Sequence, residues 1–258
     1  MTASAALPAD LERRFGALRR LYGDAGYARL RAARVAVVGV GGVGSWAAEA
    51  LARSGVASLV LIDLDHVAES NINRQVQALG HTLGRAKVLA LRERIADIHP
   101  GCEVRAVEDF VDARNWPALL PQPVDALIDA CDQVRAKAAL AAWALAGARP
   151  CVSVGAAGGK QLAQRVDVED LAAVTHDPLL ASLRQRLRRE HGAARQGRIG
   201  LRCVYSREPV SAPGEACDSD GTLNCHGYGS SVAVTATFGM VAAGEAIAQL
   251  LSRAAAGA

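Results

Sequence analysis

One short segment limits the fold of this chain more than any other part of it. The stretch Arg34-Val-Ala-Val-Val is almost entirely apolar, and four glycines follow it closely: Gly39, Gly41, Gly42 and Gly44. An apolar run without polar alternation is typical of a parallel strand that is buried on both faces. The pattern G-x-G-x-x-G between such a strand and a helix forms a phosphate-binding turn. The segment therefore predicts a Rossmann-like α/β core.

The rest of the first half continues this alternation of strands and helices. We expect further strands at 58–63, 103–107, 124–130 and 150–154, and helices at 10–33, 45–54, 84–99 and 133–148. Strands that alternate with helices of this length form βαβ units and a mainly parallel sheet with helices on both faces.

The pattern changes after residue 155. We expect strands at 164–168 and 202–206 around a charged helix at 179–190, then a long loop at 209–230 and a last helix at 232–251. We accordingly divide the chain into N-terminal helices with a nucleotide-binding Rossmann-like core, residues 1–155, and a substrate-facing half, residues 156–258. The two parts are expected to form one continuous domain.

The cysteines and the N-terminus bear on location. None of the six cysteines stands in a C-x-x-C pair, so a zinc site of the usual spacing is not expected. The N-terminus lacks a basic start followed by an apolar run, so no signal peptide is expected and the thiols suit a cytoplasmic protein. Residues 232–251 are apolar enough for a membrane span, but Glu245 and the surrounding context favour a buried helix without membrane insertion.

Charged residues after the strands indicate the ligand. Asp63 follows Gly44 by 19 residues, at the end of the second strand, where a carboxylate can accept hydrogen bonds from ribose hydroxyls. Arg74 and Lys87 would add two cations near the glycine turn, which suits a triphosphate better than NAD. Asp132, after the fourth strand, could hold Mg²⁺. Taken singly, Arg74 and Lys87 could be solvated charges and Asp132 a helix cap; their combination favours ATP.

Longer motifs resemble a known family. Residues 37–46, 61–65, 71–75 and 84–87 are similar to the ubiquitin-activating-enzyme-like superfamily of ThiF, MoeB and HesA. Stretches at 14–16, 20–23, 128–139, 177–179 and 234–239 resemble the tRNA threonylcarbamoyladenosine dehydratase (TcdA, or CsdL) branch. Together these motifs extend over nearly the whole chain, and the missing paired C-x-x-C motifs agree with that branch.

The resemblance implies an activity and a set of site residues. The enzyme would adenylate the side-chain carboxylate of threonylcarbamoyladenosine in tRNA, and ring closure would then expel AMP. Asp63 and Asn71 would bind the nucleotide, Arg74 and Lys87 would neutralise phosphate charge, and Asp132 would bind Mg²⁺. An N-terminal arginine also serves the phosphates in this superfamily; the spacing leaves Arg14 and Arg20 open, and we favour Arg20.

The resemblance also implies partners. A homodimer and a cysteine desulfurase system are expected besides tRNA. The alternative function is activation of the C-terminal carboxylate of a sulfur-carrier or ubiquitin-like protein. The absence of paired zinc cysteines argues against that alternative.

Two further sets of residues keep two interpretations each. Seven arginines lie between residues 184 and 202, with Arg184, Arg186, Arg188 and Arg189 as the predicted tRNA contacts. Such a density can neutralise RNA phosphates, or it can be a solvated helix face in an arginine-rich chain. Cys203, Cys217 and Cys225 are either ordinary loop or core cysteines or, in the case of Cys225 beside His226, a reactive thiol.

Overall fold

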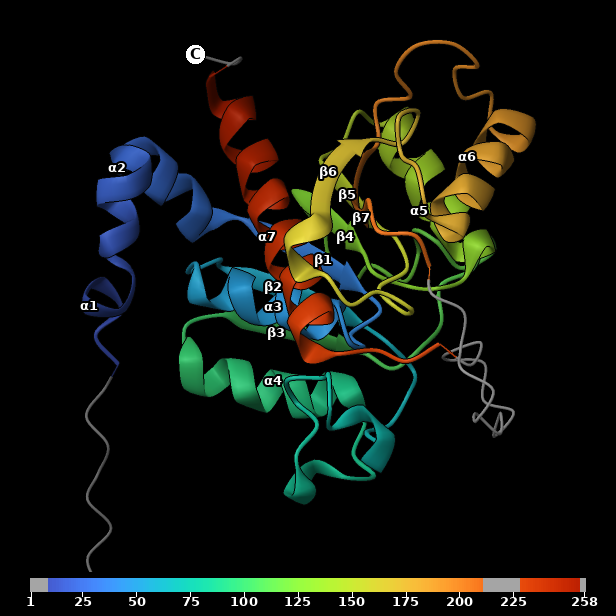
Figure 1. Cartoon of the computed structure of the whole chain (residues 1–258). Helices are drawn as coiled ribbons and strands as arrows, with labels where there is room; N and C mark the ends of the chain where they lie inside the picture. Colours follow the sequence, from blue (N-terminus) through green and yellow to red (C-terminus); the bar gives the residue numbers. More distant parts are fainter. Residues whose placement is uncertain (1–8, 211–227, 256–258) are drawn as a thin grey trace, which may run out of the picture.

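The computed structural model describes residues 9–210 and 228–255, and a single sheet of seven strands runs through them (Figure 1). The strands are β1 Arg34–Val38, β2 Ser58–Ile62, β3 Glu103–Val107, β4 Ala126–Asp129, β5 Cys151–Val154, β6 Val166–Asp170 and β7 Arg202–Ser206. Their order across the sheet is β3-β2-β1-β4-β5-β7-β6.

All neighbouring strands are parallel except β6, which pairs antiparallel with β7. The chain proceeds outward from β1 to β2 and β3 in one direction, and from β4 to β5 in the other. The carboxyl ends of β1 and β4 therefore flank the point where the strand order reverses. Ligands of open α/β sheets bind at such a point, and the glycine turn follows β1 there.

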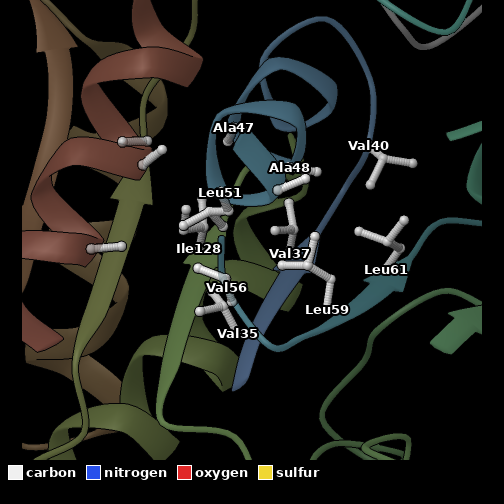
Figure 2. Packing of buried hydrophobic residues seen from close by; sticks show 14 of the residues in the cluster. Val35, Val37, Val40, Ala47, Ala48, Leu51, Val56, Leu59, Leu61 and Ile128 are labelled. Atoms are coloured by element: carbon white, nitrogen blue, oxygen red, sulfur yellow. The ribbon is translucent and has the colours of Figure 1, made fainter. Parts of the chain in front are cut away.

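Helices cover both faces of the sheet, as the sequence predicted. On one face lie α2 (Ala17–Ala32), α3 (Gly44–Arg53), α4 (Lys87–Ile98) and α7 (Val232–Ala255), and on the other lie α5 (Val134–Ala146) and α6 (Pro178–Glu190). The alternation of side chains along β1 explains this. Val35 and Val37 pack with Leu51 of α3 (Figure 2), whereas Ala36 and Val38 belong to the cluster on the other face.

The last helix, α7, packs closely against α3. A Cβ added at Gly239 would lie 2.5 Å from the carbonyl oxygen of Val43 and 2.7 Å from Cβ of Trp46, so only glycine permits this approach. The segment Val232–Ser252 is long and apolar enough to cross a membrane by composition, but half of it is buried inside the protein. Its buried residues, among them Phe238 and Leu250, belong to the main core cluster. The helix thus serves as a core helix, as expected.

Two of the expected helices differ from those observed. The predicted helix at 10–33 is divided into α1 (Leu11–Phe15) and α2, and α2 is kinked at Gly23, whose φ is +71°. The predicted helix at 84–99 begins only at Lys87. Gly84 has a φ of +78°, and the residues that follow it pair with the segment at 66–67 through the His66–Ala86 bridge. Backbone pairing with a distant segment therefore delays the helix.

Candidate active site

The glycine turn after β1 has two tight positions and two open ones. Gly39 has a φ of +81°, and a Cβ there would lie 2.8 Å from the carbonyl oxygen of Ala130. A Cβ at Gly44 would lie 1.8 Å from the carbonyl oxygen of Gly39. Gly41 and Gly42 have no neighbour closer than 3.4 Å to such a Cβ. The turn is thus fixed at its ends and accessible in its middle.

The accessible part of the turn presents backbone donors at the start of a helix. Within the described residues, no acceptor is recorded for the backbone N–H groups of Gly41, Gly42 and Val43. Val43 caps α3 without a side-chain hydrogen bond. N–H groups of this kind, together with the helix dipole, form a favourable site for a phosphate.

Asp63, directly after β2, is joined to the glycine turn. Its Oδ2 accepts a hydrogen bond of 2.8 Å from the backbone N–H of Val40, and its Oδ1 accepts one of 2.9 Å from that of Asp65. Burial raises the pKa of Asp63, and Lys87 and the two backbone donors offset this only in part. Each carboxylate oxygen has a second lone pair, so Asp63 can still accept from a ribose.

Lys87 is buried and paired with a carboxylate. It is the first residue of α4, has only 4% of its surface exposed, and places Nζ 2.7 Å from Oδ2 of Asp65. The interpretation of Lys87 as a solvated surface charge is therefore wrong. A cation in the first turn of a helix opposes the helix dipole, so the two neighbouring aspartates are what stabilise it there. Three groups, Asp63, Asp65 and Lys87, form one compact cluster beside the turn.

Arg74 lies along the open middle of the turn. A Cβ on Gly42 would meet Cγ of Arg74 at 3.4 Å, and the Arg74 guanidinium donates to the carbonyl of Ser70 at 2.6 Å and to Oδ1 of Asn73 at 2.9 Å. The indole N–H of Trp46 in α3 donates to the Arg74 carbonyl at 2.9 Å. The structure thus brings Arg74 and the glycine turn together.

Asn71 serves the local backbone. It is buried at the end of a short 3-10 helix, Glu69–Asn71, and its Oδ1 accepts from the backbone N–H of Ala68 at 3.1 Å. Its place in the segment that presents Arg74 agrees with a supporting task, and direct contact with the nucleotide remains a prediction.

Asp132 lies on the other side of the turn, beyond the end of β4. The side chain is exposed, and no hydrogen bond or ion pair of Asp132 is recorded among the described residues. Helix α5 begins two residues later with Gln133 as its N-cap, which makes no capping hydrogen bond. The interpretation of Asp132 as a helix cap is therefore wrong, and its carboxylate is free for a ligand.

The N-terminal arginines lie far from this cluster within one chain. Arg14 donates to the carbonyls of Asp97 and Ile98 at 2.8 and 2.7 Å, at the end of α4 opposite Lys87. Arg20 is exposed on α2, which packs against the C-terminal end of α7 through Arg29 and Leu250. Arg74 lies near the other, N-terminal end of α7, at Thr235. Thr235 and Leu250 are about 20 Å apart along the helix at 1.5 Å per residue. The chain by itself does not bring Arg20 to the turn.

A model of the ThiF family matches residues 14–257, nearly the whole chain. The chain belongs to the ThiF family. It is 38% identical to the tRNA threonylcarbamoyladenosine dehydratase of Haemophilus influenzae, with 95% of each chain covered. It superposes with a TM-score of 0.87 on Escherichia coli TcdA in complex with ATP, at 40% identity and with 97% of this chain and 99% of that chain covered. The AMP complex of the same enzyme gives 0.87, 41% identity, and 98% and 99% coverage. The predicted similarity to the TcdA branch is confirmed.

In this ThiF-family chain, most of the arginines that were predicted to contact tRNA already have hydrogen-bond or ion-pair partners within the chain. Arg184 donates to the carbonyls of Leu171 and Val174 at 3.0 and 2.8 Å. Arg186 and Arg189 both pair with Glu190. An open hollow on the outer face of α6 is nevertheless arginine-rich; it is lined by Ala181, Arg184, Gln185, Arg188, Arg189 and Arg195.

Of the three cysteines considered as possible thiols, the structure of this ThiF-family chain describes only Cys203. Cys203 is completely buried in β7, and burial raises its pKa well above the ordinary value. It is a core residue and not a nucleophile. Cys217 and Cys225, the predicted reactive thiol included, lie outside the described residues. Among the described residues, no group of three or more His, Cys, Asp or Glu side chains is placed to hold a metal.

Sequence reasoning missed the partners of two buried lysines in or near the site, Lys87 and Lys137. Asp65 was part of the family motif but was assigned no function, and the Asp129–Lys137 pair behind Asp132 was not considered. One signal was available: the chain has three lysines among 29 basic residues, Lys87, Lys137 and Lys160, and all three are buried. An isolated lysine in an arginine-rich chain thus marks a buried position here.

Proposed function

We propose that this ThiF-family protein catalyses the ATP-dependent cyclodehydration of threonylcarbamoyladenosine in tRNA. The observation that carries the proposal is the placement of Arg74, Lys87 and Asp63 around one glycine turn, in a chain similar over its whole length to tRNA threonylcarbamoyladenosine dehydratases. The alternative, a protein carboxylate as substrate, receives no comparable full-length support.

The reaction has two steps. The side-chain carboxylate of the modified nucleoside attacks the α-phosphorus of ATP, which forms an acyl-adenylate and releases pyrophosphate. A nucleophilic atom of the same nucleoside then attacks the activated carbonyl, closes the ring, and expels AMP. The nucleoside loses the elements of one water in total: the oxygen leaves within AMP, and the two hydrogens leave as protons. No enzyme thiol is required, because the adenylate is itself the activated acyl group.

The residues of the cluster divide this work. Asp63 accepts from the ribose, and the free N–H groups of the turn together with Arg74 hold the phosphates. Lys87 has three N–H donors, of which Asp65 takes one. The remaining donors can neutralise charge that develops on the leaving pyrophosphate, because Lys87 is already held in place before the reaction.

Asp132 fits a magnesium ion held jointly with the phosphates. Mg²⁺ is usually bound through one or two carboxylates plus phosphate oxygens and waters, without a closed protein cage. An exposed carboxylate that has no partner among residues 9–210 and 228–255, beside a phosphate turn, matches that donor set. When bound, the ion would neutralise phosphate charge and orient the leaving group.

The tRNA would contact the arginines of α6. We assign Arg184, Arg186, Arg188 and Arg189 to this surface, with the hollow that includes Arg195 as its most basic part. Arginines act on RNA through phosphate neutralisation and counterion release. We also propose a cytoplasmic location, which agrees with a tRNA substrate. A homodimer is proposed as the source of an N-terminal arginine such as Arg20, which one chain does not deliver to the turn; a cysteine desulfurase partner rests on the family resemblance alone.

The decisive experiment uses tRNA that carries threonylcarbamoyladenosine. The tRNA is incubated with the protein, ATP and Mg²⁺, then digested, and the nucleosides are weighed by mass spectrometry. We expect the modified nucleoside to lose the mass of one water while AMP and pyrophosphate form in equal amounts. An unchanged nucleoside mass, with a folded protein that binds ATP, would refute the proposal.

A further inference from the structure

Behind Asp132 lies an ion pair that is completely removed from solvent. Lys137 in α5 is 0% exposed and Asp129 at the end of β4 is 1% exposed, and Nζ lies 3.0 Å from Oδ2. Burial on its own would lower the pKa of Lys137, but the carboxylate of Asp129 outweighs it and the pKa is raised. The charged, ammonium form of Lys137 is therefore favoured by its contact with Asp129.

The pair is the centre of a network in which every strong donor has an acceptor. Lys137 Nζ also donates to the carbonyls of Asp129 and Cys131 at 3.3 and 3.1 Å. Asp129 accepts from Oγ of Ser153 in β5 at 2.7 Å and from the backbone N–H of Cys131 at 3.3 Å. The network joins β4, β5 and α5 to the segment 130–132 that follows β4.

That segment forms the back of the glycine turn. The backbone N–H of Ala130 donates to the carbonyl of Val38 at 2.8 Å, and a Cβ at Gly39 would lie within 2.9 Å of both the Ala130 carbonyl oxygen and the Cys131 nitrogen. Its last residue is Asp132. A displacement of segment 130–132 would therefore move Asp132 and the first glycine of the turn together.

Buried ion pairs seldom serve stability alone. Their desolvation commonly cancels the attraction, and apolar residues of similar size often replace them without loss of stability. What such a pair does provide is a defined position, because a buried charge tolerates few alternative arrangements. Outer residues that orient a metal ligand typically change metal affinity or activity by 10 to 100-fold when they are substituted.

We propose that Lys137 is a positioning residue for the adenylation step: paired with Asp129, it fixes segment 130–132 so that the Asp132 carboxylate faces the metal and phosphate position beside Gly39. The proposal rests on the proposed function through the assignment of Asp132. Lys137 is assigned no contact with the nucleotide, since its ammonium is buried and, within the described part of the chain, its polar contacts are to segment 129–131.

The test compares two buried lysines. Lys137→Met removes the pair, and Lys160→Met removes a lysine that is 2% exposed and donates to the carbonyls of His176 and Glu208, which lie outside segment 129–132. Pyrophosphate release with modified tRNA is measured across a Mg²⁺ series, beside thermal melting. For Lys137→Met we expect the Mg²⁺ concentration at half-maximal rate to rise about tenfold and kcat to fall about tenfold, with KM for tRNA within about twofold. Lys137→Arg should restore most of both.

Several outcomes would overturn the proposal. A folded Lys137→Met enzyme with the parent Mg²⁺ curve and kcat would do so, and so would an equal Mg²⁺ shift in Lys160→Met, because the effect would then be one of general destabilisation. If Lys137→Met does not fold, the double variant Asp129→Asn with Lys137→Met avoids the unpaired buried charge. That variant should show the same Mg²⁺ shift, and a parent-like curve from it refutes the positioning role.

Asp132→Ala separates this proposal from the one it rests on. If Asp132→Ala loses the Mg²⁺ dependence while Lys137→Met keeps the parent curve, the assignment of Lys137 alone is refuted. If Asp132→Ala itself keeps the parent curve, the magnesium role of Asp132 is refuted, and the positioning role of Lys137 with it.

Discussion

The glycine turn and the outer face of α6 both collect cations, and they hold them in opposite ways. At the turn, Lys87 is buried against Asp65 and Arg74 is held by the backbone of neighbouring segments. On α6, Arg186 and Arg189 share the carboxylate of Glu190 in water. A charge fixed in a dry, packed site acts strongly on a developing anion, whereas exposed pairs contribute little and are screened by salt. The comparison predicts large catalytic effects at the turn and modest, salt-dependent binding effects on α6.

The largest effect is expected at Lys87. Lys87→Ala should slow pyrophosphate release about a hundredfold, or about 3 kcal/mol in the barrier, because a preorganised charge near the leaving group is lost. The melting temperature should change little, since Asp65 is 37% exposed and can be hydrated when it loses its partner. Arg85→Ala is the matched control, because Arg85 is two residues away and pairs with the exposed Glu93. If the Lys87→Ala enzyme releases pyrophosphate at a rate within a fewfold of the parent, the buried Lys87 does not contribute to adenylation.

A second effect concerns the backbone of the turn. Gly39→Ala should reduce the free energy of unfolding by about 2 kcal/mol, because a side chain is strained at a φ of +81° and meets the backbone of segment 130–131. Denaturant unfolding measures the change. Gly80→Ala, at a glycine with nothing within 4 Å and without positive φ, should stay within about 0.5 kcal/mol of the parent. Equal losses for both would mean that the turn is not sterically determined.

The third prediction concerns which nucleotide the turn accepts. ATP with Mg²⁺ should bind, and NAD should not bind at comparable concentrations, since NAD lacks the terminal phosphates that Arg74 and Lys87 would meet. One charge-assisted hydrogen bond that is lost costs about 2 kcal/mol, or roughly thirtyfold in affinity. Calorimetric titration with each ligand decides the matter, with Asp132→Ala titrated by ATP at several Mg²⁺ concentrations as a sharper measurement. Tight NAD binding in the absence of ATP binding would contradict the assignment.

The smallest effect is expected on α6. Replacing Arg186, Arg188 and Arg189 with Glu should weaken tRNA binding and lower its salt dependence by roughly two to three in log–log slope, as expected for three phosphate contacts. ATP affinity should be unchanged. The matched control replaces Arg92, Arg105 and Arg114 with Glu, which changes the net charge equally at exposed positions elsewhere. Filter binding across a salt series compares the two. If both variants lose tRNA binding alike, net charge and not the α6 surface governs association.

The elements of the fold differ in how well the sequence predicted them. The strands β1 and β2 beside the turn were predictable because buried parallel strands require uninterrupted apolar runs. The edge strand β3 and the strand β7 also have the bounds that were expected. The start of α4 was not predictable, because the bridge between His66 and Ala86 is a contact between separate segments. The kink of α2 at Gly23 was missed for a different reason: the apolar spacing continues through it.

The sequence predicted which residues form the candidate site, but not which of them are buried or already paired. Motif spacing placed Asp63, Arg74, Lys87 and Asp132 at one sheet edge, since parallel strands end together. That Lys87 is buried and paired with Asp65, and that Arg184 serves backbone carbonyls, depends on side-chain packing that no local pattern encodes. The arginine cluster looked uniform in sequence because charge density does not reveal which guanidinium groups already have partners.

The close contact of α7 with α3 has a consequence for how the protein is made. The segment that carries Arg74 is held partly by α7, through Thr235, and by the bond from Asn73 to the carbonyl of Ser230. Ribosomes add about 5–20 residues per second, so roughly 10–40 seconds separate the synthesis of the glycine turn from that of the last helix. During that interval the nascent chain has its phosphate turn but lacks the element that completes it. A chain whose translation stops before residue 228 would therefore carry every nucleotide motif and still lack a finished nucleotide site.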